Sequence, residues 1–268
     1  MTNMGGRILL LLAVLLAAPR VWAHETRPAL LSQVHFEQRL HAQLPLDLVL
    51  HDATGKSIRL GTYFGNKPVI LVLSYYRCAR LCPLVLDGLV QSLQALAFTV
   101  GEEFDVVTVS IDPRDTPATA AATKAPYIQR YGRAGAAAGW HFLTGEPEVI
   151  ARLADTVGFR YVYDAQADQF AHASGIMVAT PEGKLARYFY GLEYAPWEVR
   201  LSLVEAAARR IGSPVDQLLL FCYHYDPKTG QYSLIVQNVL RVAGVVTVLT
   251  LGLGVGILLH RERTGKAR

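Results

Sequence analysis

The sequence predicts an α/β domain followed by one membrane-spanning helix, and three observations lead to this prediction. β-rich apolar segments alternate with segments of helical periodicity through the middle of the chain, which is typical of an α/β domain. An apolar run stands near the N-terminus, and a longer uncharged run stands near the C-terminus. With 51% of its 268 residues apolar and 18% charged, the chain is too apolar to be disordered.

The N-terminal segment has the three parts of a secretory signal peptide. Arg7 supplies the positive charge, residues 8–18 form the apolar centre, and a small-residue cleavage site ends at Ala23. A membrane anchor is the alternative, but the apolar run is short for a bilayer span. We therefore predict a signal peptide over residues 1–23.

The central part of the chain predicts a domain over residues 45–212, after a lead-in segment over residues 24–44. The lead-in is expected to be extended or helical, and its stretch "SQVHFEQRLHAQ" is compatible with a short amphipathic helix. A hairpin is predicted over 44–60, and the Ala/Gly-rich residues 132–139 are expected to form a loop. We expect strands at 67–76, 104–112, 140–145, 160–164, 173–180 and, after a turn at Pro181–Lys184, 185–191, and helices at 83–100, 115–132, 146–159 and 196–212.

The C-terminal run predicts a membrane anchor. Val242–Leu259 is uncharged and just long enough to span a bilayer, and a buried helix of a soluble domain is the alternative. The tail that follows is basic, so the positive-inside rule places it in the cytoplasm. We predict a transmembrane helix over 239–259 in the inner membrane, a cytoplasmic tail over 260–268, and a domain facing the periplasm. Much of the net charge of +4 lies in this tail, and no basic stripe predicts a nucleic-acid partner.

Cys78 and Cys82 lie between the strand expected at 67–76 and the helix expected at 83–100. The N–H groups and dipole at a helix N-terminus favour thiolates, which attack disulfides and bind soft metals. In an exported domain the pair forms a structural disulfide, performs redox chemistry or binds a metal. A disulfide across so short a loop stabilises little, so the last two alternatives are favoured and both stay open.

A soft ion such as Cu(I) fits two thiolates and one imidazole, which calls for a third ligand. His172 is the candidate among eight histidines, because we expect it in a polar loop just before a buried strand. A loop at the edge of a sheet would hold its side chain in a fixed position.

Three segments resemble the signatures of the SCO/SenC family of membrane-tethered, thioredoxin-fold copper proteins. They are "CARLCP" from Cys78, "SIDPRDTP" from Ser110 and "HASGIMVATPEGKL" from His172. The resemblance covers roughly residues 40–212 and implies a thioredoxin-like fold, with a central sheet flanked by helices. It also implies that Cys78, Cys82 and His172 bind copper, as Cu(I) or Cu(II).

The same resemblance implies a role in assembling the copper site of cytochrome c oxidase. The partner would be the oxidase subunit that carries this site, with a copper donor protein as a second partner. Copper delivery and reduction of the site's cysteines are both roles of the family. A metallochaperone is favoured, and a thiol–disulfide oxidoreductase, in which Cys78 attacks and Cys82 resolves, is the alternative. A peroxidase is disfavoured because Tyr75 stands where such a site has threonine.

Asp112 falls in the family's Asp-Pro segment and is expected to orient the metal ligands, with a turn or cap role as the alternative. For Asp115 a turn or cap role is the expected one. The chain departs from the family pattern in its C-terminal anchor, in Arg77 at a usual threonine and in Ala79 at a usual proline. Arg77 and Arg80 are expected either to stabilise a thiolate or copper complex or to be solvated.

Cys222 and His224 lie in an aromatic-rich linker predicted over residues 213–238. The two side chains share one face if the segment is extended. A linker at the membrane interface with an incidental cysteine is one interpretation. A second soft-metal or redox site is the other.

Overall fold

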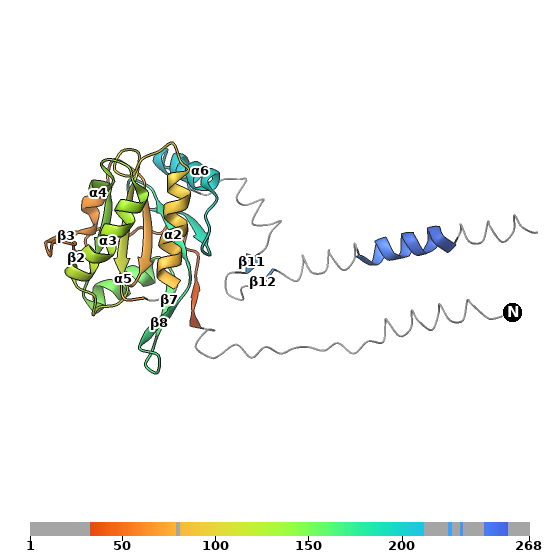
Figure 1. Cartoon of the computed structure of the whole chain (residues 1–268), viewed down its shortest axis with the longest axis horizontal. Coiled ribbons are helices and arrows are strands. Elements are labelled where there is room, and N and C mark those ends of the chain that lie inside the picture. The colour runs from red at the N-terminus through yellow and green to blue at the C-terminus, as the bar shows by residue number, and fades with distance from the viewer. Residues whose placement is uncertain (1–32, 79–80, 212–224, 227–230, 233–243, 257–268) are drawn as a thin grey trace, which may run out of the picture.

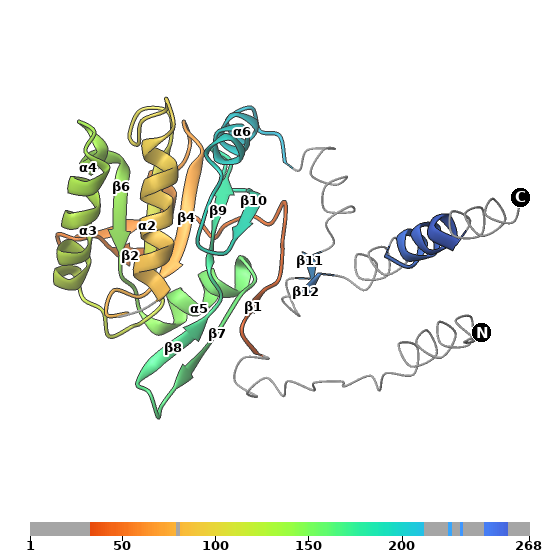
Figure 2. The same ribbon diagram turned by 45° about the vertical axis from the view of Figure 1, so that its right-hand side comes forward.

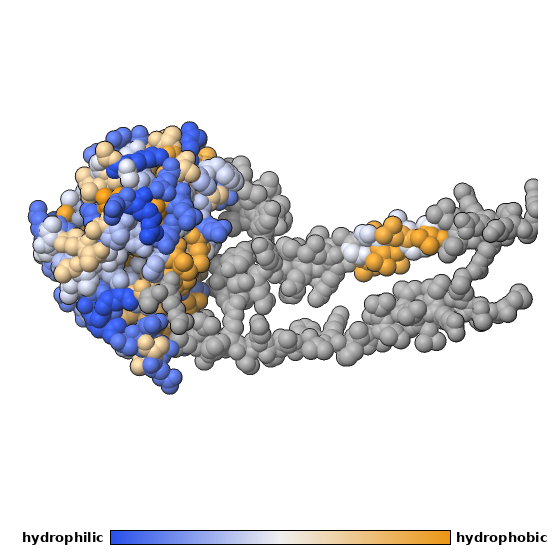
Figure 3. Space-filling model, in the orientation of Figure 1, coloured by the Kyte–Doolittle hydropathy of each residue, from blue (hydrophilic) through white to orange (hydrophobic). Residues whose placement is uncertain are grey.

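The computed structural model describes residues 33–78, 81–211, 225–226, 231–232 and 244–256. The predicted signal peptide, the Cys222–His224 pair, Arg80 and the predicted cytoplasmic tail lie outside these residues. Residues 244–256 are helical, and their valine and leucine side chains are exposed (Figure 3). Within the described ranges, no helix is long and apolar enough to cross a membrane. The span predicted over 239–259 extends past the described helix at both ends and stays a prediction.

A five-stranded sheet forms the centre of the domain, in the order β10-β9-β4-β5-β6 (Figures 1 and 2). The central strand β4 runs parallel to β5, which runs parallel to β6, whereas β9 and β10 are antiparallel additions on the other side. Every residue of β4 and β9 is buried, as expected for strands covered on both faces. The strands are β4 (Val69–Ser74), β5 (Asp105–Ser110), β6 (Trp140–Leu143), β9 (Gly175–Ala179) and β10 (Leu185–Tyr190).

Helices cover both faces of this sheet. The alternation of β4 decides which side chains point to which face: Ile70 and Val72 pack with α2, α3 and α6, whereas Val69, Leu71 and Leu73 pack with α5 and the N-terminal segment. The helices are α2 (Leu81–Gln94), α3 (Pro117–Tyr131), α4 (Ala136–Gly139), α5 (Pro147–Thr156) and α6 (Pro196–Ala207). This layered α/β architecture confirms the predicted fold class.

A second, three-stranded antiparallel sheet lies at one edge of the domain, in the order β1-β7-β8. Its strands are β1 (His35–Phe36), β7 (Phe159–Asp164) and β8 (Gln169–His172). The β7–β8 hairpin projects from the body of the domain (Figures 1 and 2). A smaller hairpin of β2 (Val49–His51) and β3 (Ser57–Arg59) confirms the one predicted over 44–60 and leads into the short 3-10 helix η2 (Leu60–Tyr63). Within the predicted linker, β11 (Tyr225–Asp226) pairs with β12 (Gln231–Tyr232).

One alternative is decided by the structure and two local predictions are wrong. Of the two forms expected for the lead-in, the described part contains the extended strand β1 and no amphipathic helix, because Phe36 is buried in β1 against the rings of Phe159 and Tyr188. The segment predicted as a loop contains α4, whose Gly139 lies so close to Gly101 that a Cβ atom would come within 2.2 Å of its Cα. His172 lies at the end of strand β8 and not in a loop.

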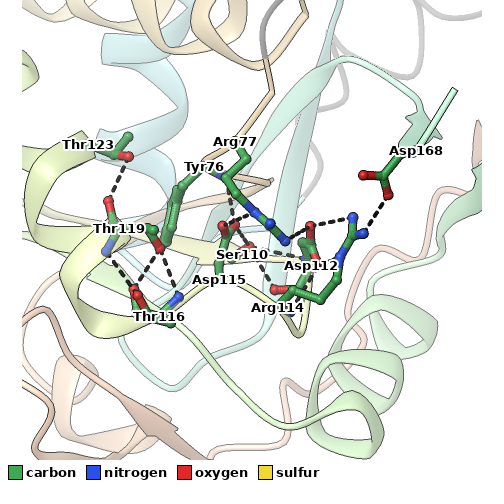
Figure 4. Close-up of polar contacts among 10 residues, drawn as sticks. All are labelled: Tyr76, Arg77, Ser110, Asp112, Arg114, Asp115, Thr116, Thr119, Thr123 and Asp168. Atoms are coloured by element: carbon green, nitrogen blue, oxygen red, sulfur yellow. Dashed lines mark hydrogen bonds and ion pairs between the residues drawn. The ribbon is translucent and has the colours of Figure 1, made fainter.

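The start of α3 agrees with the sequence. Thr116 is the N-cap residue: its hydroxyl accepts a hydrogen bond from the Thr119 backbone N–H at 3.2 Å. The Thr119 hydroxyl oxygen in turn accepts one from the Thr116 N–H at 2.8 Å (Figure 4). This reciprocal cap fixes where the loop that follows β5 ends.

Candidate metal centre

The two cysteines follow strand β4, in which every residue is buried. Strand β4 ends at Ser74, and Cys78 follows in the loop, while Cys82 lies in the first turn of α2. Cys82 is only 2% exposed and Cys78 is half-buried. The Cys82 backbone N–H points at the Cys78 sulfur, with a distance of 3.4 Å. Strand and helix therefore hold both sulfurs on one side of the loop, as the sequence predicted.

His172 reaches the same place from the second sheet. Its Nε2 atom lies 3.0 Å from the Cys82 Sγ atom. The ligand atoms of Cys78, Cys82 and His172 all lie within 4.8 Å of one another. The side chain is buried, although it comes from an edge strand. The structure thus brings together the three residues that the sequence singled out.

A backbone hydrogen bond orients the His172 ring. Nδ1 lies 2.9 Å from the carbonyl oxygen of Ala173, and a carbonyl only accepts, so Nδ1 carries the proton and donates it. The Nε2 lone pair then faces Cys82 and accepts the S–H. A metal ion between these atoms would replace that shared proton, and the Nδ1 contact would fix the ring for coordination.

Aromatic rings enclose the ligands. The rings of Tyr75 and Phe159 each lie 5.8 Å from the His172 ring, and Phe170 lies 5.7 Å from Tyr75. Burial raises the pKa of Tyr75, and its hydrogen bond to Cys78 raises this pKa further. The surroundings are therefore poor in water on the histidine side.

Burial also raises the pKa of the Cys82 thiol well above its usual value, and the neighbouring Cys78 adds to the effect. For Cys82 this outweighs the helix N-terminus, which was expected to favour the thiolate. The thiol is protonated at neutral pH in the metal-free protein. A metal ion that binds here must displace a proton.

Asp115 fastens the segment that precedes Cys78. Its Oδ2 atom accepts hydrogen bonds from the Tyr76 backbone N–H at 2.7 Å and from the Ser110 hydroxyl at 2.6 Å (Figure 4). Its Oδ1 atom lies 3.3 Å from Nε of Arg77. Asp115 is buried and does more than the turn or cap role expected for it, since Thr116 is the cap.

Asp112 acts on the cysteine loop through Arg77. The Arg77 Nη2 atom donates to Asp112 Oδ2 at 3.0 Å, and Arg114 binds the same carboxylate through Nε and Nη2, both at 2.9 Å. Burial acts to raise the pKa of Asp112, but the Arg114 hydrogen bonds outweigh it and the pKa is lowered. Arg77, expected beside the thiols or in solvent, is bound to two buried carboxylates.

Sequence reasoning missed the structural importance of Asp115, Ser110 and Arg114. One signal was available. Strands β4 and β5 are parallel and in register, with Ser74 opposite Ser110, so the residues that follow both strands meet at one edge. Applying that rule to the two predicted strands would have placed the segment after Ser110 beside the segment that leads to Cys78.

Comparison with known proteins agrees with this geometry. The model of the SCO1/SenC family matches residues 37–204, more than half of the chain. The chain belongs to the SCO1/SenC family. A search of curated proteins gave no match.

Solved structures of other proteins have the same fold as this family member. One from Aquifex aeolicus VF5, described as an electron transfer protein, is 29% identical, with 66% of this chain and 98% of that chain covered and a TM-score of 0.56. A second from the same organism, described as an electron transport protein, is 29% identical, with 63% and 99% covered and a TM-score of 0.52. BsSco, described as a member of a family of cytochrome c oxidase assembly proteins with a disulfide switch, is 20% identical, with 65% and 98% covered and a TM-score of 0.50.

The donor set suits copper. Thiolates are soft ligands that bind Cu(I) or zinc in preference to harder ions, and imidazole is a ligand for copper and zinc as well. The three atoms lie close enough to share one ion, and the Nε2 lone pair already faces the cluster. The residues present therefore fit the ion that the sequence predicted.

Proposed function

We propose that this chain is a membrane-tethered copper chaperone for the copper site of a respiratory cytochrome c oxidase. Cys78, Cys82 and His172 bind the copper, which is cargo. The observation that carries the proposal is that these three donors, from the loop after β4, from α2 and from β8, meet within 4.8 Å. Membership of the SCO1/SenC family supports the same role.

The targeting signals in the sequence support a periplasmic location for this activity. The signal peptide over 1–23 exports the chain, and the helix over 239–259 holds it in the inner membrane with the domain in the periplasm. Tethering raises the effective concentration of the domain near membrane-bound oxidases. The partners are the oxidase subunit that carries the copper site and a protein that donates copper.

Different side chains serve the binding and the release of the copper ion. Cys82 and His172 are buried and shield the ion, and Cys82 gives up its proton when copper binds. Cys78 is half-buried, so a ligand of the partner reaches the ion from this side. Copper then passes by ligand exchange, without release into solution.

Copper stoichiometry and spectroscopy of the reduced, loaded protein test the proposal. We expect one retained copper per wild-type chain. His172→Ala should weaken retention at least about 10-fold and change the absorption spectrum, because a ligand is lost. His51→Ala removes a histidine of the β2–β3 hairpin and serves as the matched control, and Cys222→Ser tests whether the linker contributes a second site. Failure of the wild-type protein to retain copper would refute the proposal.

The unequal exposure of the cysteines favours a second candidate, a thiol–disulfide oxidoreductase that reduces the client's cysteines before metal insertion. The thiolate of half-buried Cys78 attacks a client disulfide, forming a mixed disulfide and releasing one client thiol. Cys82 then attacks the Cys78 sulfur, which frees the second client thiol and leaves a Cys78–Cys82 disulfide. Two electrons pass to the client, and an external dithiol reductant must restore the pair.

His172→Ala separates the two functions. Attack by Cys78 does not use the imidazole, so the variant should form the mixed disulfide with a model disulfide at nearly the wild-type rate. A chaperone needs the imidazole, so the variant should lose copper. A large loss of mixed-disulfide formation in His172→Ala would count against the second candidate.

A further inference from the structure

Arg114 stands between the two parts of the molecule that supply the metal ligands. Its Nε and Nη2 atoms bind Asp112, each at 2.9 Å, and its Nη1 atom binds Asp168 at 2.5 Å (Figure 4). One guanidinium thus joins a carboxylate beneath the cysteine loop to a carboxylate of the β7–β8 hairpin. We call Arg114, Asp112 and Asp168 the Arg114 latch.

On its inner side the latch reaches the cysteines. Asp112 is 1% exposed and also binds Arg77, the residue directly before Cys78. The Arg114 backbone N–H donates to Asp112 Oδ1 as well, at 2.9 Å. The inner contact is therefore buried, multiple and bound to the loop that carries the first ligand.

On its outer side the latch reaches the strand that carries His172. Asp168 lies in the turn between β7 and β8, and the Tyr163 hydroxyl donates to its Oδ1 atom at 2.6 Å. The Arg114 guanidinium also lies 5.2 Å from the centre of the Tyr163 ring and 5.8 Å from that of Phe170. Arg114 therefore contacts both strands of the hairpin.

The backbone secures only the base of this hairpin. Strand β1 pairs with β7 only at Phe159 and Arg160 among the described residues. Beyond that point β7 pairs with β8 alone, up to Asp164 opposite Gln169. The outer part is held to the domain by side chains, among which Arg114 makes the charged contact.

We propose that Arg114 is a positioning residue that holds the hairpin against the domain and thereby keeps His172 at the cysteine pair. This proposal rests on the proposed function in one respect, that the ion held by the three ligands is copper. His172 lies at the inner end of the hairpin, opposite Tyr161, so opening of the outer contact frees the tip first and reaches His172 through strand β8, while Cys78 and Cys82 stay in place. The latch thus sets the rate at which the third ligand is given up.

The exposure of the two contacts makes the outer one the weaker. The Asp168 side chain is 70% exposed and the Arg114 side chain 40%, whereas Asp112 is buried. An exposed ion pair is screened by salt, and a buried one much less so. The outer contact therefore opens first and responds to ionic strength.

Asp168→Asn is the sharpest variant. It keeps the side-chain shape and removes the charge, and asparagine tolerates the left-handed backbone of this residue, with φ of 49°. Asp47→Asn is the matched control, because Asp47 and Arg152 form an exposed ion pair away from the hairpin. Arg114→Lys keeps the positive charge but loses the planar guanidinium, which binds Asp112 and Asp168 at the same time. We therefore expect this variant to loosen the hairpin less than Asp168→Asn does.

Hydrogen exchange of the metal-free protein tests the latch without reference to copper. In Asp168→Asn, the amides of Tyr161–Tyr163 should exchange roughly two to five times faster than in wild type, the range expected from an exposed ion pair. The amides of β4 and α2 should not change. Salt should speed hairpin exchange in wild type and have little effect in Asp168→Asn. Equal hairpin exchange in wild type, Asp168→Asn and Asp47→Asn would overturn the proposal.

Transfer of copper to a competing chelator tests the link to the ligands. Release from Asp168→Asn should be faster by the same two- to five-fold, with Asp47→Asn unchanged. Faster hairpin exchange without faster release would show that the hairpin does not control His172, and would overturn the positioning role. If no variant and no wild-type sample binds copper while hairpin exchange still responds, the proposed function fails and the latch stands.

Discussion

The cysteines and the histidine of the metal centre are held by parts of the molecule that differ in construction. Cys78 and Cys82 follow β4, a strand with neighbours on both sides and helices over both faces. His172 ends β8, the edge strand of a small sheet. Two ligands are thus fixed by the core, and the third is carried by an element that can move without unfolding the domain.

This difference suits a protein that must both hold and transfer an ion. A site with three ligands on the core would bind copper firmly and exchange it slowly. A site with all ligands on mobile segments would lose the ion to solvent. Mutations that act on one side only show whether the difference is real.

The largest effect is expected from the core beneath the cysteines. Leu71 in β4 is fully buried, so Leu71→Ala should lower the free energy of unfolding by about 2–5 kcal/mol. Tyr163 on the hairpin is 44% exposed, and Tyr163→Ala should lower it by less than about 1 kcal/mol. Denaturant unfolding followed by circular dichroism measures both. Similar losses in the two variants would mean that hairpin and core form one cooperative unit.

Asp115 allows a finer test, because it fixes the cysteine side alone. Asp115→Asn removes the charge that binds the Tyr76 N–H and Arg77, and should cost about 1–3 kcal/mol of unfolding free energy. Asp164→Asn is its counterpart on the hairpin, where the carboxylate accepts from two exposed backbone N–H groups and its loss should cost under about 0.5 kcal/mol. Chemical denaturation measures both values. An equal cost would show that the cysteine loop is no better anchored than the hairpin.

The two sides of the site also differed in how well the sequence predicted them. The strand β4, the helix α2 and the cysteines between them follow from local apolar patterns and from the spacing of Cys78 and Cys82. His172 was identified from its surroundings and a family resemblance, but its strand was not. The pairing of β7 with β1 brings Phe36, far away in the chain, beside Phe159, and no local pattern encodes it.

The polar contacts beneath the site were harder still to predict from the sequence. Asp115 was interpreted as a turn or cap residue, since Asp-Thr-Pro at the start of a helix is typical of a cap. The sequence did place Asp112 near the metal loop, but not the two arginines that bind it. Which cation meets which carboxylate depends on how strand ends assemble in three dimensions, so only the structure reveals it.

A histidine remote from the site separates the stability of the fold from the retention of the metal. His141 lies on the edge strand β6 with its ring 4.0 Å from that of Tyr63, and burial, followed by Lys124 and Lys67, lowers its pKa to about 4. In the unfolded chain this pKa is about 6.5. Between these values the unfolded chain binds the proton and the folded one does not, so stability is lost as the pH falls from about 6.5 to 4, by at most ~1.4 kcal/mol per unit.

His141→Phe keeps the ring contact and removes the titration. Denaturant unfolding at a series of pH values should therefore give a flatter curve for the variant across this window. Copper retention should still fall with acid in both proteins, because protons compete for the thiolates. If His141→Phe also removed the acid sensitivity of copper retention, copper loss would be a consequence of unfolding and not of ligand protonation.

Tyr75 contacts both sides, and its two contacts are chemically separable. The hydroxyl hydrogen-bonds to Cys78, whereas the ring packs against His172 and Phe170. Tyr75→Phe removes only the first contact. A hydrogen bond to a charged acceptor is stronger than one to a neutral acceptor, by about 1 kcal/mol, and the Cys78 sulfur becomes a thiolate when it binds a metal. Copper affinity should therefore fall roughly two- to ten-fold, and exchange of the hairpin amides should not change.

Tyr75→Ala removes the ring as well and should loosen the hairpin in addition. Chelator competition measures the affinity, and hydrogen exchange at Tyr161–Tyr163 measures the hairpin. If Tyr75→Phe loosened the hairpin as much as Tyr75→Ala, the hydroxyl on Cys78 would be part of what holds His172. The cysteine and histidine sides would then move together, and the distinction between fixed and adjustable ligands would no longer hold.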